Sequence, residues 1–135
     1  MSASAKKCVI AGDRWQALVD HEWRVDSASA ADFDRVLDRL DAHVYTLITI
    51  HAEGGKHLAI GGGDGRYVVY ATFDDEVFWN LLSTNPGTGT VLLSAGGQEG
   101  DFPAERIVSK EQARAAGHAF LAAGRLDARQ RWRQA

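Results

Sequence analysis

The hydrophobic pattern changes its period twice along this chain. Apolar and polar positions mostly alternate from about residue 14 to residue 25, which predicts a half-buried strand, and residues 8–11 predict a shorter strand before it. Between about residues 30 and 42, apolar side chains recur at the i, i+3, i+4 and i+7 positions of an amphipathic helix. Ser29 precedes this segment and has an acid three residues on, as expected of a helix N-cap.

From residue 44 onward the period is two again, and turn-forming residues interrupt it every several positions. Because short turns join consecutive strands, we expect an antiparallel meander. The glycine cluster 61–65 is interpreted as a hairpin turn, since it matches no phosphate-loop spacing, and 67–73 is apolar on both faces and is predicted to be central. The expected strands are 44–51, 57–60, 66–73, 77–82 and 90–94.

The last third of the chain predicts a second helix. After a turn at 96–101, residues 105–108 are expected to be extended, and Ser109 with Gln112 has the spacing of a capping box at a helix start. We therefore predict an α+β fold, in which one helix from the N-terminal half and one C-terminal helix pack on an antiparallel β-sheet meander.

Composition limits the class of protein. A chain of 135 residues with 45% hydrophobic content and no linker-like stretch predicts one domain over residues 1–135. The net charge of -3 disfavours nucleic-acid binding, and the arginines after residue 124 are interpreted as a solvated helix end. The apolar segment 8–11 is too short for a signal peptide or membrane span, and the single cysteine agrees with a reducing compartment. We expect a cytoplasmic protein with no membrane partner.

The sequence offers no pattern that carries enzyme chemistry. No serine lies in a nucleophile elbow, and no His-Glu-x-x-His motif occurs. The one close histidine pair, His51 and His57, is placed to face across a hairpin, but two ligands do not make a zinc site, although a third from Asp or Glu stays open. We predict no catalytic residue, no metal and no cofactor.

A family resemblance begins at about residue 44 and is strongest over 96–132. The positions that carry it are Gly96-Gly97, 101–104, 107–113, Ala116, Phe120, Gly124-Arg125 and Trp132. In this region the chain resembles immunity protein family one, whose members are small cytoplasmic proteins of bacterial polymorphic-toxin and interbacterial competition systems. The resemblance implies neutralisation of a toxin, above all a nucleic-acid deaminase, by protein–protein interaction. After the last helix the chain has Gly124-Arg125-Leu126 where the family commonly has Gly-x-Arg-Pro.

Most matched positions are explained as scaffold, so the toxin contacts need a separate argument. A deaminase that grips nucleic acid needs a basic surface around its pocket, and its inhibitor should offer acids and an aromatic side chain there. The alternative interpretation of each is structural: solvated turn acids for the carboxylates and core packing for the tryptophan. The interface candidates are Asp74, Asp75, Glu76, Trp79, Glu99 and Asp101.

Two other functions stay open at this point. The chain also fits a small ligand-binding or regulatory α+β domain that uses a pocket on its sheet, or a small enzyme with a histidine-containing site. Ligand-induced melting shifts without a protein partner would favour the first, and bound metal the second.

Overall fold

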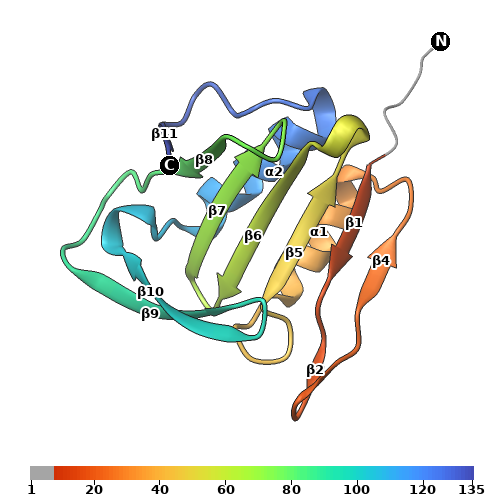
Figure 1. The fold of residues 1–135 in the computed structure, drawn as a ribbon, viewed down its shortest axis with the longest axis horizontal. Coiled ribbons are helices and arrows are strands. Elements are labelled where there is room, and N and C mark those ends of the chain that lie inside the picture. The colour runs from red at the N-terminus through yellow and green to blue at the C-terminus, as the bar shows by residue number, and fades with distance from the viewer. Residues whose placement is uncertain (1–7) are drawn as a thin grey trace.

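A seven-stranded antiparallel sheet organises the computed structural model, which describes residues 8–135 (Figure 1). Its strand order is β11-β8-β7-β6-β5-β1-β4, so the first four strands of the predicted meander lie together in this sheet. The fifth predicted strand, 90–94, lies outside it, which corrects that part of the prediction. The fold is α+β, as the sequence predicts. The strands are β1 (Val9–Gly12), β4 (Trp23–Val25), β5 (Leu47–His51), β6 (His57–Gly63), β7 (Arg66–Thr72), β8 (Phe78–Leu81) and β11 (Trp132–Gln134).

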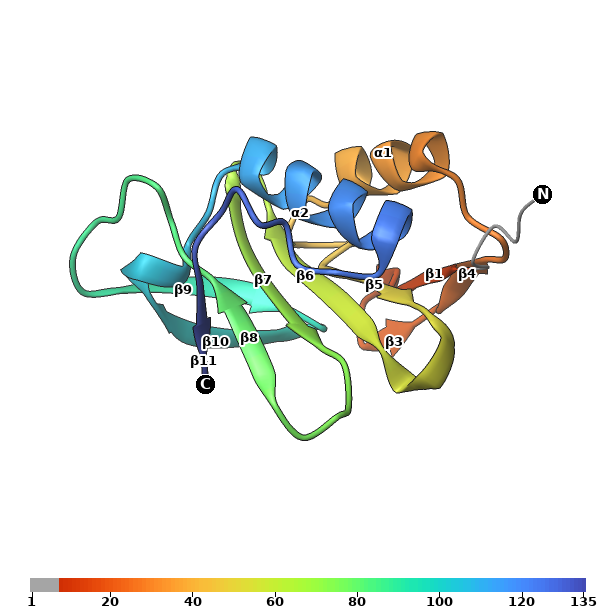
Figure 2. The same cartoon turned by 90° about the horizontal axis from the view of Figure 1, so that it is seen from above.

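Both helices, α1 (Ala30–Arg39) and α2 (Lys110–Ala123), pack on one face of this sheet (Figure 2). The core lies between them and the strands. Close approach of the helices depends on Gly117, because a Cβ there would lie 2.6 Å from Cε1 of Phe33. Phe33, Leu37 and Phe120 from the helices and Ile10, Ile48, Ile50, Leu58 and Ile60 from the strands are fully buried.

The two helix starts use their caps differently. Ser29 Oγ accepts from the Asp32 backbone N–H at 3.1 Å, and the Asp32 carboxylate accepts from the Ser29 N–H at 2.9 Å, which completes a capping box. Ser109 Oγ likewise accepts from the Gln112 N–H at 3.1 Å. The Gln112 side chain, however, donates to the Leu82 carbonyl at 3.0 Å, so only half of the predicted box forms.

Part of the predicted strand at 14–25 is wrong. A tight hairpin interrupts it, with β2 (Trp15–Gln16) paired to β3 (Val19–Asp20). Ala17 has a φ of 53°, and Leu18 at the tip is 93% exposed. The alternation misled because the residues of a two-residue hairpin also change sides at each step.

The other face of the sheet is crossed by a separate two-stranded ribbon of β9 (Thr90–Ala95) and β10 (Gln98–Pro103) (Figures 1 and 2). β10 was not predicted, because its sequence is mostly polar and a turn was expected at 96–101. The turn needs only Gly96 and Gly97, whose φ values are 67° and 78°. A 3₁₀ turn, η2 (Ala104–Arg106), replaces the first half of the extended segment expected at 105–108. The second half is extended as predicted, and Val108 forms an antiparallel bridge with Tyr67.

Glycines of β6 explain how the ribbon comes so close. Gly61, Gly62 and Gly63 lie inside the strand, and only Asp64-Gly65 forms the hairpin turn, so the prediction of a turn over the whole cluster is wrong. A Cβ on Gly61 would lie 2.5 Å from the Cβ of Ala95 in the ribbon. Glycine is needed here for close packing of two β layers.

Candidate functional site

Four aromatic rings cross the sheet face opposite the helices, which we call the open face. His51, His57, Tyr70 and Phe78 come from β5, β6, β7 and β8 and alternate with core residues of those strands. Successive ring centroids are 5.8, 5.8 and 5.7 Å apart. His51 and His57 are register partners across their hairpin, as predicted. We call these four residues the aromatic row; all are half-buried or exposed.

Within the aromatic row, the surroundings of His51 and Tyr70 favour the uncharged form of each ring. Desolvation lowers the pKa of His51, and the positive charges of His57 and Arg24 lower it further. Burial raises the pKa of the Tyr70 hydroxyl, and the nearby negative charge of Asp75 adds to this. The row is therefore a partly apolar strip with a carboxylate near one end.

That carboxylate belongs to the acidic turn, residues 74–76, between β7 and β8. The Asp74 side chain accepts from the backbone N–H groups of Glu76 and Val77, both at 2.9 Å, and these bonds lower its pKa. Asp74 thus shapes the turn, as the structural interpretation of turn acids expects. The Asp75 and Glu76 carboxylates are exposed and make no ion pair with any residue from 8 to 135.

The other interface candidates lie elsewhere. Trp79 alternates with Phe78 and so shares a face with the core residues Ala71 and Leu81, where it is half-buried. Glu99 and Asp101 belong to β10 and are exposed on the ribbon. The ribbon crosses the sheet near the start of β7, whereas the acidic turn follows the end of β7 (Figure 1). The structure therefore splits the candidates into two acidic groups and a tryptophan that joins neither.

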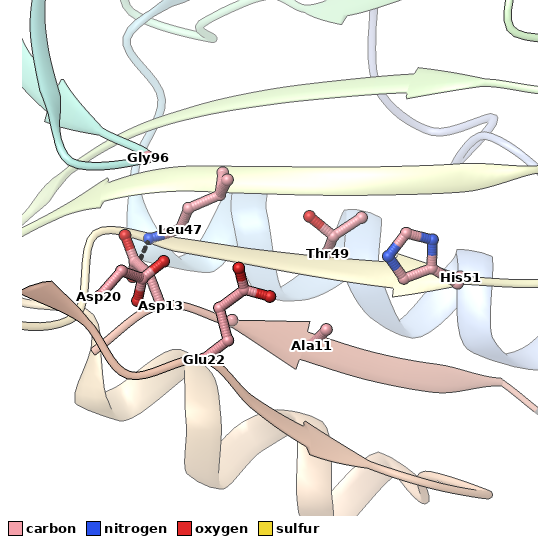
Figure 3. Close-up of a pocket in the computed structure, with 9 residues that line it drawn as sticks. Ala11, Asp13, Asp20, Glu22, Leu47, Thr49, His51 and Gly96 are labelled. Atoms are coloured by element: carbon pink, nitrogen blue, oxygen red, sulfur yellow. Dashed lines mark hydrogen bonds between the residues drawn. The ribbon is translucent and has the colours of Figure 1, made fainter. Parts of the chain in front are cut away.

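A hollow of about 280 Å³ lies beside the aromatic row, between β1, β5 and the β2–β3 hairpin (Figure 3). Its deepest acid, Asp13, is buried and accepts from the N–H groups of Thr46 at 2.7 Å and Leu47 at 2.9 Å. The Glu22 side chain points into the hollow beside Thr49 and His51. In the part of the chain that the structure describes, no three His, Cys, Asp or Glu side chains are grouped to hold a metal.

A comparison with protein-family models decides the family. The model of immunity protein Imm1 matches residues 21–134. The chain belongs to the Imm1 family. A search of curated proteins finds no match. The Imm1 match reaches from β4 to β11, so it starts well before residue 44, where the resemblance was first visible in the sequence.

The residues that carried the Imm1 resemblance hold the scaffold. Gly124 ends α2 with a φ of 64°. Trp132 of β11 pairs with Leu81 of β8, and its indole N–H donates to the Asp127 carbonyl at 3.1 Å. The later arginines lie beyond α2, which corrects their interpretation as a helix end, and Arg133 pairs with Glu105. No helix within residues 8–135 is long and apolar enough to cross a bilayer.

Two parts of the site were missed in the sequence. The aromatic row was hidden because residues 67–73 are apolar on both faces, so Tyr70 was indistinguishable from its buried neighbours. The hollow was missed because Glu22, which precedes β4, and Thr49 of β5 are far apart in sequence. The period of two could have identified these residues, because in each strand the positions between the helix-facing ones lie on the open face.

Proposed function

We propose that this Imm1 protein binds a cognate toxin that is a nucleic-acid deaminase and neutralises it by covering the toxin's active site. Membership of the Imm1 family over residues 21–134 is the observation that carries the proposal. The deaminase and the mode of inhibition rest on the family resemblance and on the distribution of charge, and no catalysis by the immunity protein is needed.

Unpaired acids support a basic partner. Within residues 8–135, many acids are already neutralised: Asp34 and Asp38 pair with α2, and Glu105 pairs with Arg133. In contrast, Asp75, Glu76, Glu99 and Asp101 are exposed and have no cationic partner among the described residues. A deaminase that binds a phosphate backbone carries lysines and arginines around its pocket, so these acids would steer the encounter and set its orientation.

The open face offers aromatic side chains that can form the centre of an interface. Interfaces gain most of their affinity from a desolvated centre with aromatic side chains, surrounded by a polar rim. Here Tyr70 and Phe78 are half-buried rings on an open surface, and the free Asp75 carboxylate lies near Tyr70. We infer that the aromatic row forms the centre and the acidic turn part of the rim.

Co-expression with the toxin domain encoded by the neighbouring gene tests the proposal. We expect restored growth, a complex that survives size-exclusion chromatography, and loss of base deamination in vitro when the purified proteins are mixed. Single-stranded DNA, double-stranded DNA and RNA should each be supplied as substrate. A toxin that deaminates none of them, yet is neutralised, would retain the immunity role and refute the deaminase.

Charge reversal tests the acidic turn. Asp75→Lys with Glu76→Lys should weaken toxin binding by at least about tenfold, chiefly through slower association and with a strong dependence on salt. The single variant Glu76→Lys is also measured, and Glu111→Lys is its control. Glu111 is an exposed acid on α2, at the other face of the sheet. Unchanged toxin affinity in the double variant would remove the acidic turn from the interface.

A further inference from the structure

A small pocket lies under the ribbon, between β10 and the open face. Its volume is about 230 Å³, and its walls are mostly apolar, from Ala59, Gly61, Tyr70, Ala95 and Phe102. Sites for drug-sized ligands and cofactors occupy roughly 300–1,000 Å³. The ribbon pocket is therefore large enough for one side chain or a very small molecule.

One cation, Arg106, also lines this pocket. Its guanidinium carbon lies 5.7 Å from the ring centroid of Phe102, and its Nε is buried without a hydrogen-bond partner. The adjacent Glu105 carboxylate contacts Arg133 and forms no ion pair with Arg106, so it compensates the Arg106 charge only through longer-range attraction. Within residues 8–135, Arg106 makes no ion pair.

This arrangement leaves a positive charge only partly compensated. Arginine keeps its charge in proteins, and burial lowers the pKa of the Arg106 guanidinium, which marks the cost of desolvating it. The contact with Phe102 offsets some of that cost. By comparison, Arg114 on α2 is held by two carboxylates, Asp34 and Asp38. The Arg106 guanidinium can therefore accept an anionic partner, and its fork geometry suits a carboxylate.

We propose that the ribbon pocket receives a carboxylate side chain, Asp or Glu, from the toxin, with Arg106 as its ion-pair partner. This inference rests on the proposed function and names one contact of the interface. The surrounding charge favours a protein occupant. Glu99 and Asp101 on the outer surface of β10 repel a free anion, whereas a toxin can offer basic side chains to these acids together with one acid for Arg106.

Arg106→Gln tests the contact, because glutamine keeps much of the length and polarity but removes the charge. We expect the toxin dissociation constant to rise at least about thirty-fold, mainly through faster dissociation. The melting temperature of the free variant should stay the same or rise, since an unpaired, half-buried charge is removed. Arg131→Gln, at an exposed arginine of the same chain, should leave both quantities unchanged. Arg106→Lys, which keeps the charge but not the fork, should fall between wild type and Arg106→Gln and serves if the glutamine variant does not fold.

A double-mutant cycle identifies the partner. Each toxin Asp or Glu is replaced by its amide, and one replacement should lose its effect on affinity when combined with Arg106→Gln. Titration of 3-phenylpropionate without toxin, followed by NMR, examines a free carboxylate as the occupant. Binding of this probe that requires Arg106, together with unchanged toxin affinity in Arg106→Gln, would overturn the inference while neutralisation, and thus the proposed function, stands. If the wild-type protein binds no toxin, both fail together.

Discussion

The two faces of the sheet are made by alternate residues of the same strands, yet they differ in almost every property. Toward the helices, Ile48, Ile50 and Ile60 are fully buried in an apolar core. On the open face, Thr49, His51 and Tyr70 are polar, titratable or aromatic, and hollows remain between them. The comparison teaches that stability and recognition are separated by a single step along each strand. Substitutions of core side chains toward the helices should therefore change mainly stability, and substitutions of exposed side chains on the open face mainly recognition.

The largest expected effect is on the helix-covered face. Phe120→Ala removes a fully buried ring that lies 6.2 Å from the Phe73 ring, and it should lower the free energy of unfolding by about 3–5 kcal/mol. Urea unfolding followed by tryptophan fluorescence measures this. Leu92→Ala, at a ribbon leucine that is 56% exposed, should change stability by less than about 0.5 kcal/mol. Equal losses in the two variants would contradict the division between the faces.

The next effect concerns the contact between the ribbon and the open face. Gly61→Ala places a methyl group against the Cβ of Ala95, so we expect a loss of about 1–3 kcal/mol in stability. Combining it with Ala95→Gly should restore most of that loss, because the opposing methyl group is then absent. Gly87→Ala is a matched control, since its added Cβ would meet only Ala104 at an ordinary 3.8 Å. A double variant that is no more stable than Gly61→Ala would show that the ribbon does not rest on Gly61.

A smaller effect is expected at the outer surface of the helices. Asp34 of α1 lies 2.7 Å from His118 Nε2 and accepts from Arg114 Nη1 at 2.8 Å; these bonds, that to His118 first, lower its pKa. Since the folded-state pKa is depressed, this stabilisation is present above the unfolded pKa and is lost as pH falls through the folded value. Asp34→Asn should cost less than about 1 kcal/mol at pH 7, because solvent screens the cluster.

The measurement is urea unfolding of Asp34→Asn and wild type between pH 7 and pH 2. The difference in stability should shrink as pH falls and vanish in acid. A difference that is constant with pH would mean that the variant acts through packing and not through the carboxylate charge.

The smallest effect lies within the aromatic row. His57→Asn removes one of the positive charges that lower the pKa of His51, so the pKa of His51 should rise toward 6.5, although desolvation, the larger cause, remains. Because a depressed histidine pKa makes the unfolded state protonate first, wild-type stability should fall as pH drops below about 6.5 toward the folded value. NMR titration of the His51 ring protons measures the shift. No change would indicate that the rings are farther apart in solution than 5.8 Å.

The sequence predicted those elements whose signal is local. Ser29 and Asp32 specify a helix start by themselves, and the meander strands each have an apolar face and a nearby turn. The failures involve partners distant in sequence. β10 is polar because mainly Gly100 and Phe102 face the sheet. The Gln112 side chain does not complete the capping box because it donates to the carbonyl of Leu82, thirty residues away. All six interface candidates stay predictions: Asp74, Asp75, Glu76, Trp79, Glu99 and Asp101. Arg106 was not singled out because nothing local in the sequence marks a cation without a counter-ion.

Both borders of the main sheet are short. β4 and β11, the outermost strands of the seven, are three residues each, so little unpaired backbone is available for another chain to extend the sheet. A partner must then be recognised through side chains, which can be exchanged one at a time without disturbing a hydrogen-bonded ladder. Such a scaffold can follow a changing toxin by point substitution on the open face and the ribbon, while the residues that define the family stay in place.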